Sequence, residues 1–152
     1  MPAALGAMAN SIWPASKRVP WDLRAHVPDA VVMELGENDC HMFNCTSPAN
    51  VALLSSAYVS FVHNITGAYG VPKMPVFLTI AMHEAGQSKA MIAAATQLAA
   101  QGYKVQFLNA TVPPVLPDGT PVAIGCGGHP SAQAHGLAFE RAQPVIAAVL
   151  GW

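Results

Sequence analysis

Three short apolar runs alternate with three helix-like segments along this chain, and no other feature of the sequence restricts the fold as strongly. The runs span residues 30–35, 76–80 and 104–109. Their length and composition are typical of buried strands. Because each run is followed by a helical segment, the order predicts an open parallel sheet with right-handed crossovers. We therefore expect an α/β fold of the three-layer, flavodoxin-like kind.

The three helices are predicted from apolar periodicity and from the signals at their ends. They are expected over residues 48–68, 88–101 and 131–150. Ser47, Ser88 and Ser131 are expected to cap their first turns, because a serine side chain accepts a hydrogen bond from a free backbone N–H at that position. Pro144 lies inside the third segment and is expected to kink it or divide it.

Composition bounds the size of the protein and its partners. A chain of 152 residues is expected to form a single domain over residues 1–152. A net charge of −1 provides no basic surface for nucleic acid, and the apolar stretches are too short to span a membrane. Apolar residues make up 53% of the chain and charged residues only 10%. This composition suits a buried parallel sheet, and it equally suits a domain without the segment that covers part of its apolar surface.

Three cysteines permit at most one disulfide. Cys40 and Cys45 are close in sequence, whereas Cys126 would approach them only if the two loops that carry these residues meet. Three free, partly buried thiols are an equally good interpretation. No second pair of ligands has zinc-like spacing, so we expect neither a metal nor a cofactor.

Three Asn-X-Thr acceptor sequences, which begin at Asn44, Asn64 and Asn109, favour a protein of the secretory pathway. Residues 1–10 lack the basic start and the full apolar segment of a signal peptide. We therefore expect a secreted glycoprotein whose signal peptide is not part of this sequence.

Two motifs follow predicted strands. Gly-Glu-Asn-Asp at residues 36–39 comes directly after the first strand, at the start of a loop expected over residues 36–48. Gly-Cys-Gly-Gly-His-Pro-Ser at residues 125–131 lies between the third strand and the last helix. In a parallel sheet the carboxyl ends of the strands share one edge, where ligands bind. We therefore expect Asn38 and His129 to lie at the same edge.

These two motifs offer the parts that ester hydrolysis needs. His129 is a candidate general base, and Pro130 would hold its backbone extended. The Asn38 amide is a candidate donor to an oxyanion, while Gly36 permits a sharp turn and Asp39 is expected to bond backbone groups of the loop. The alternative is ordinary turn chemistry beside a solvent-exposed histidine.

The same motifs resemble signature blocks of the SGNH (GDSL-type) hydrolases, which are serine esterases. Residues 36–39 match the Gly-X-Asn-Asp block, and His129 with Pro130 matches the His-Pro block. Residues 28–39 and 125–136 are similar to the carbohydrate-esterase branch that deacetylates xylan-type polysaccharides. The resemblance covers about residues 20–150. It implies acetylated carbohydrate, or another small ester, as substrate, with His129 as base.

The sequence also departs from that family. No Gly-Asp-Ser turn is present, and none of Ser11, Ser16 and Ser88 has the required context, so the nucleophile is unknown. Gly127 and Gly128 occupy the positions where the family usually has an orienting aspartate. Some members of the branch use a backbone carbonyl in that role. The block that supplies a glycine amide to the oxyanion hole is not identifiable either.

These departures leave three hypotheses. The first is an esterase domain that lacks its N-terminal strand and serine, so that the sheet is incomplete on its N-terminal side. The second is a non-catalytic carbohydrate-binding or accessory domain derived from such an esterase. The third is a small α/β protein with coincidental turns. Trp13, Trp21 and Phe43 are possible walls of a sugar site, although packing in the core or at an edge is the commoner role for such residues.

Overall fold

The computed structural model describes residues 22–81 and 85–152. Three strands form one parallel sheet, as the sequence predicted, and their order in the sheet is β1-β2-β3. They are β1 (Val31–Met33), β2 (Val76–Ile80) and β3 (Val105–Asn109). The described helices are η2 (Leu23–Ala25), α2 (Glu37–Met42), α3 (Pro48–Tyr69), α4 (Ala85–Ala100), η3 (Cys126–Gly128) and α5 (Ala132–Leu150).

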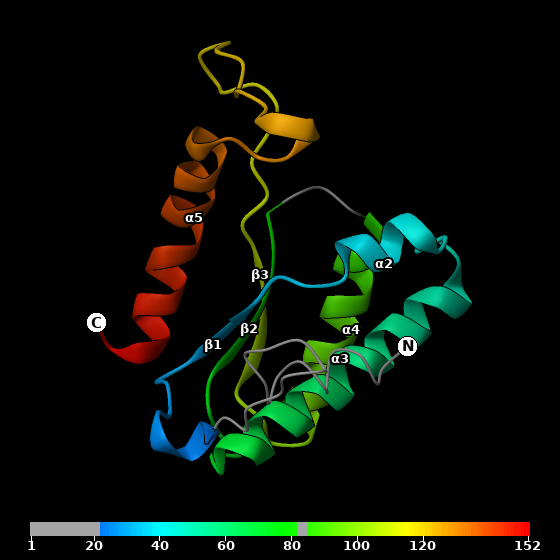
Figure 1. Ribbon diagram of the computed structural model, residues 1–152, viewed down its shortest axis with the longest axis vertical. Coiled ribbons are helices and arrows are strands. Elements are labelled where there is room, and N and C mark those ends of the chain that lie inside the picture. Colours follow the sequence, from blue (N-terminus) through cyan, green and yellow to red (C-terminus); the bar gives the residue numbers. More distant parts are fainter. Residues whose placement is uncertain (1–21, 82–84) are drawn as a thin grey trace.

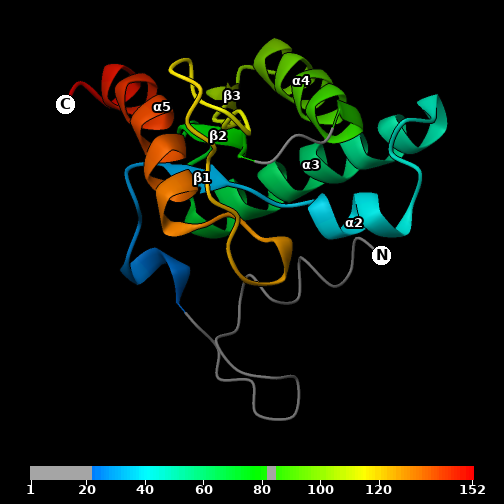
Figure 2. The same cartoon turned by 90° about the horizontal axis from the view of Figure 1, so that it is seen from above.

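The described part of the chain has three layers, which confirms the α/β prediction. Helices α3 and α4 lie on one face of the sheet and α5 lies on the other (Figures 1 and 2). The strand order runs in one direction, so the right-handed crossovers that contain α3 and α4 place both helices on the same face, and α5, which follows the last strand, covers the other. It is the partial form of a flavodoxin-like fold, with three strands in the sheet.

The larger core lies between the sheet and the helices α3 and α4. Alternate strand residues point into it, and β2 is buried along its whole length because it is the central strand. The cluster includes Met33, Tyr58, Val62, Leu78, Ile80, Met91 and Leu98. A smaller cluster under α5 contains Phe77, Leu108, Ala110 and Ala138. The two clusters fix the sheet between its helical layers.

The α5 face is covered unevenly. Val32 in β1 remains 52% exposed, and Val145 and Val149 on α5 remain 40% and 46% exposed. α5 packs against β3, which is the edge strand at the opposite side of the sheet from β1. The outer edge of β1 therefore has no strand beside it among the described residues, and the apolar surface next to it is open.

Most helix boundaries agree with the sequence, but the cap expected at Ser88 and a division of the last helix at Pro144 do not occur. Ser47 and Ser131 cap α3 and α5, each accepting a 3.2 Å hydrogen bond from a backbone N–H three residues later. Ser88 does not cap α4, because the helix already begins at Ala85. Pro144 does not divide α5. The carbonyl of Glu140, which Pro144 cannot pair, belongs to an exposed residue where solvent can satisfy it.

Candidate functional site

The Gly-Glu-Asn-Asp motif is a turn followed by a short helix, and the prediction of a plain loop over residues 36–48 was therefore wrong. Gly36 has φ 106° and ψ −5°, and α2 begins at the next residue. Asn38 is exposed in the first turn of α2, between Glu37 and Asp39. Both acidic side chains stand near the positive end of the helix, which favours them there.

The last carbonyl before this turn is held from two helices. The Tyr58 hydroxyl in α3 donates to the Leu35 oxygen over 2.6 Å, and the Gln87 amide in α4 donates to the same oxygen over 2.8 Å. Tyr58 and Gln87 are only 4% and 2% exposed. The sequence does not reveal this role, because Tyr58 fits the apolar stripe of its helix and Gln87 precedes the helix predicted over residues 88–101. The available signal in the sequence was the hydroxyl of Tyr58, which is a polar group within the otherwise apolar stripe of α3.

Tyr58 also explains why the turn requires glycine. A Cβ on Gly36 would collide with the Tyr58 hydroxyl, and the positive φ at this position disfavours any other residue. Burial raises the pKa of the Tyr58 hydroxyl well above its ordinary value, a hydrogen bond from Gln87 offsets part of that rise, and the charge of Asp39 adds to it. The hydroxyl is therefore a protonated donor at neutral pH.

A disulfide links the far end of α2 to the segment before α3. Cys40 and Cys45 are bonded, with their Cα atoms 5.1 Å apart, while Cys126 is free and exposed. The sequence had left the pairing open. Cys45 is buried, and its carbonyl lies so close to Gly86 at the start of α4 that no Cβ would fit there. The Asn50 amide donates to the Asn44 carbonyl over 3.0 Å in the same segment.

An apolar cavity of about 250 Å³ lies beside the turn. Its polar wall comes from Asp39 and Asn50, and the aromatic side chain of Phe43, which is 42% exposed, lies at the same cavity. The remaining lining is mainly aliphatic and aromatic, from β1, the segment after it and α3: Met33, Leu35, Leu53, Leu54, Ala57, Tyr58 and Phe61. The other proposed aromatic walls, Trp13 and Trp21, lie outside the described residues, as do Ser11 and Ser16.

The second motif holds the backbone of His129 on both sides. The His129 N–H donates to the Cys126 carbonyl over 3.2 Å, and the His129 carbonyl accepts from the Gly125 N–H over 2.7 Å. The backbone is extended at φ −73° and ψ 161°, as Pro130 requires of the residue before it. Gly127 and Gly128 have positive φ, so an aspartate at either position would be strained. The backbone conformation at these two glycines therefore disfavours the aspartate that the family usually has there.

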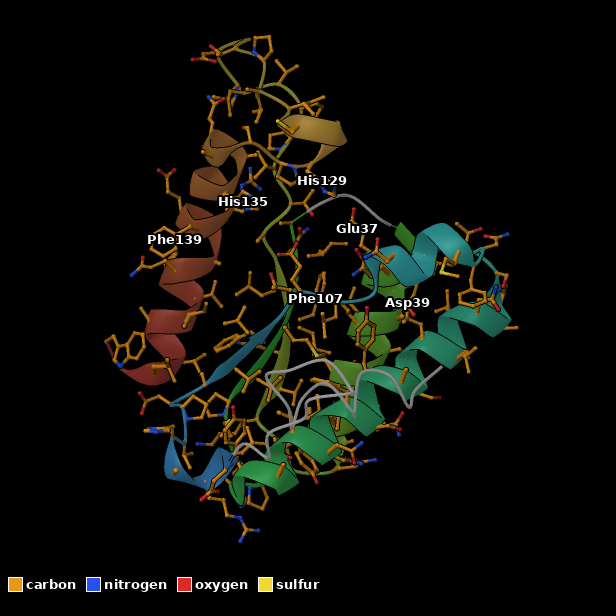
Figure 3. The ribbon with its side chains drawn as sticks, viewed as in Figure 1. Glu37, Asp39, Phe107, His129, His135 and Phe139 are labelled. Carbon is orange, nitrogen blue, oxygen red and sulfur yellow. A yellow bond between two sulfur atoms is a disulfide. The ribbon has the colours of Figure 1, made fainter. Side chains whose placement is uncertain are left out.

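Both motifs lie beyond the carboxyl ends of the strands. Figure 3 shows His129 and Glu37 at this same end of the sheet, with His135 farther along on α5. His129 and Asn38 are both exposed. Within residues 22–81 and 85–152, no side chain hydrogen-bonds to the His129 ring, so the ring is open to a substrate or to solvent.

Electrostatic and metal-binding features near the sheet are few. The Glu34 carboxylate, at the end of β1, accepts a 2.9 Å hydrogen bond from the Ala81 N–H just after β2. No group of three or more metal-binding side chains occurs in the part of the chain that the structure describes. Within the same residues, no helix is long and apolar enough to cross a membrane.

Comparison with known proteins supports the fold. The sequence matches no protein-family profile and no curated protein. The structure is similar to that of a family two carbohydrate esterase from Cellvibrio japonicus, with a TM-score of 0.63 and 19% sequence identity. The alignment covers 91% of this chain and 38% of the esterase chain, so this chain spans well under half the length of that protein. At this identity, the likeness shows a shared fold.

Proposed function

We propose that this chain is the base-bearing and oxyanion-binding part of a serine-type ester hydrolase of the SGNH kind, which removes O-acetyl groups from carbohydrate. His129 is the general base, Asn38 is the oxyanion donor, and Gly36 and Asp39 support the loop. One observation carries the proposal: the Asn38 turn and the His129 loop lie at the same end of a parallel sheet. The fold similarity to a carbohydrate esterase supports the choice of reaction.

In this reaction, His129 accepts the proton of the nucleophilic hydroxyl while its oxygen attacks the ester carbonyl carbon. The Asn38 amide donates to the oxyanion that forms. The bond to the sugar oxygen then breaks, and His129 returns the proton to that oxygen. Water hydrolyses the acyl-enzyme by the same two steps, which releases acetate.

The nucleophile is proposed to lie on a strand outside the described residues. The outer edge of β1 offers unpaired backbone groups to such a strand, and Val32 leaves apolar surface open beside it. A parallel strand added at this edge would end close to Gly36, because the carboxyl ends of parallel strands meet at one edge. A serine in the turn after it would then reach the Asn38 site.

A second candidate is a non-catalytic carbohydrate-binding domain. The observation that favours it is that Phe43, which is partly exposed, and Asp39 line the same cavity. A cavity lined by both a flat aromatic side chain and a hydrogen-bond acceptor suits a sugar ring. In this case an acetylated oligosaccharide would bind without being hydrolysed.

The test measures acetate release from an acetylated xylan-type oligosaccharide by the protein expressed from its complete transcript. His129→Ala should abolish release, whereas His63→Ala should preserve it, because His63 lies on α3 and bonds Gln101. Undiminished release by His129→Ala would refute the assignment, and binding without release would favour the second candidate.

We further propose that this is a protein of the secretory pathway, since the acceptor residues Asn44, Asn64 and Asn109 are all exposed. Mass spectrometry of glycans on the natural protein tests this proposal.

A further inference from the structure

We propose that Tyr58 and Gln87 are positioning residues that set the orientation of Asn38. The inference rests on the proposed function, since it concerns the oxyanion donor of that site. It goes beyond the function in assigning a role to two buried side chains that lie on different helices and outside both motifs.

The first step is the carbonyl of Leu35. It receives two hydrogen bonds, from the Tyr58 hydroxyl at 2.6 Å and from the Gln87 amide at 2.8 Å. A carbonyl oxygen has two lone pairs, and both are used here. The peptide plane between Leu35 and Gly36 is therefore fixed relative to α3 and α4 at the same time.

The second step is the short path from that plane to Asn38. Gly36 packs against the Tyr58 hydroxyl, and its carbonyl accepts a 3.0 Å hydrogen bond from the Cys40 N–H, which closes the first turn of α2. Asn38 is the second residue of this helix. A helical turn is rigid, so the orientation of the Leu35 peptide is transmitted to the Asn38 backbone.

The third step is the cost of the arrangement. A buried amide such as that of Gln87 loses its bonds to water, and this loss is tolerated only when the group is hydrogen-bonded. Burial likewise favours a neutral Tyr58 hydroxyl. The polar groups are explained by what they hold, namely the start of the turn that presents Asn38.

The other end of α2 is held independently. The Cys40–Cys45 disulfide and the contact of Cys45 with Gly86 fix the end of the helix against α4. Loss of the Tyr58 hydroxyl alone should therefore leave α2 in place and allow its first turn to shift. This separates a positioning role from a general contribution to folding.

The experiment compares Tyr58→Phe with Tyr103→Phe in the 152-residue chain. Both remove one hydroxyl from a tyrosine of the α3/α4 core, but Tyr103 packs against His63 and not against the turn. Nuclear magnetic resonance measures the χ1 couplings and the side-chain order parameter of Asn38. We expect Tyr58→Phe to average the couplings and lower the order parameter, and Tyr103→Phe to change neither. If Tyr58→Phe does not fold, Gln87→Met takes its place.

A kinetic arm uses the protein expressed from its complete transcript. Tyr58→Phe should lower kcat by up to about 10²-fold with KM unchanged, as misplacement of a catalytic group does. In an Asn38→Ala background it should have no further effect on kcat, which a general loss of stability would not reproduce.

The two arms separate the possible failures. The positioning role is overturned if the folded Tyr58→Phe or Gln87→Met variant has the wild-type χ1 couplings and the wild-type order parameter for the Asn38 side chain. If the wild-type protein hydrolyses no ester, the proposed function fails, and the magnetic resonance result alone decides the role of Tyr58 and Gln87.

Discussion

The Tyr58 hydroxyl donates a 2.6 Å hydrogen bond to the backbone carbonyl of Leu35, which lies 23 positions earlier in the chain. This bond joins the middle of α3 to the end of β1, at the turn that carries Asn38. It also places the hydroxyl where a side chain on Gly36 would have to lie. Several measurable properties of the protein depend on this pair of residues.

Replacement of Gly36 by alanine should destabilise the fold by more than its backbone conformation alone explains. A left-handed conformation costs a non-glycine residue about 1–2 kcal/mol, and a Cβ at Gly36 would also collide with the Tyr58 hydroxyl. Gly102→Ala is the control, because Gly102 has a similarly positive φ with no atom within 4 Å of its Cβ position. Urea unfolding measures both losses; equal losses would contradict the collision.

A double-mutant cycle gives a second test of the collision between a side chain at position 36 and the Tyr58 hydroxyl. In a Tyr58→Phe background the hydroxyl is gone, so Gly36→Ala should lose less stability there than it loses in the wild type. Urea unfolding of the two single variants and the double variant completes the cycle. Strict additivity of the two changes would show that the hydroxyl does not limit the residue at position 36.

The free energy of unfolding should fall more steeply above pH 10 in the wild type than in Tyr58→Phe. Burial raises the pKa of Tyr58 above its ordinary value of 10.0. A raised folded-state pKa gives stability that is complete below the unfolded-state pKa and is lost as pH rises toward the folded-state pKa. The difference in slope should approach about 1.4 kcal/mol per pH unit. Chemical denaturation between pH 8 and pH 11 (roughly the range that brackets the unfolded-state pKa) checks it; parallel curves would exclude a buried, protonated Tyr58.

Removal of the Cys40–Cys45 disulfide should lower stability by about 2 kcal/mol, the value that loop-closure entropy gives for a short loop. The double variant Cys40→Ser/Cys45→Ser measures this loss in urea. Cys126→Ser is the matched control, because that thiol is free and exposed, and it should unfold with the wild-type midpoint. Thiol counting by mass spectrometry should find one free cysteine in the native protein; three would exclude the bond.

Asn38→Ala should lower kcat by about 10²–10³-fold, or about 2.7–4 kcal/mol of transition-state stabilisation, as loss of an oxyanion donor does. KM should change little, because the donor acts on charge that develops only in the transition state. Steady-state kinetics on an acetyl ester measure both constants, in the protein expressed from its complete transcript. A rise in KM at constant kcat would move Asn38 from catalysis to substrate binding.

The sequence alone was sufficient to predict the parallel α/β class and the positions of all three described strands. Short apolar runs bounded by turn residues are local signals, and so are the serine caps of α3 and α5. The two motif loops could be assigned to one edge of the sheet for the same reason, because the chain order of a parallel α/β fold determines which ends of the strands meet.

Tertiary structure decided what local signals do not contain. Residues 36–42 could be an open loop or a helix, and contacts from Tyr58 and Gln87, 22 and 51 residues after Gly36 in the numbering, settle the turn. The start of α4 at Ala85 and the choice of Cys45 as partner of Cys40 depend in the same way on how α4 packs against the segment before α3. Burial and close approach between distant segments are properties of the folded chain, and no local pattern of residues determines them.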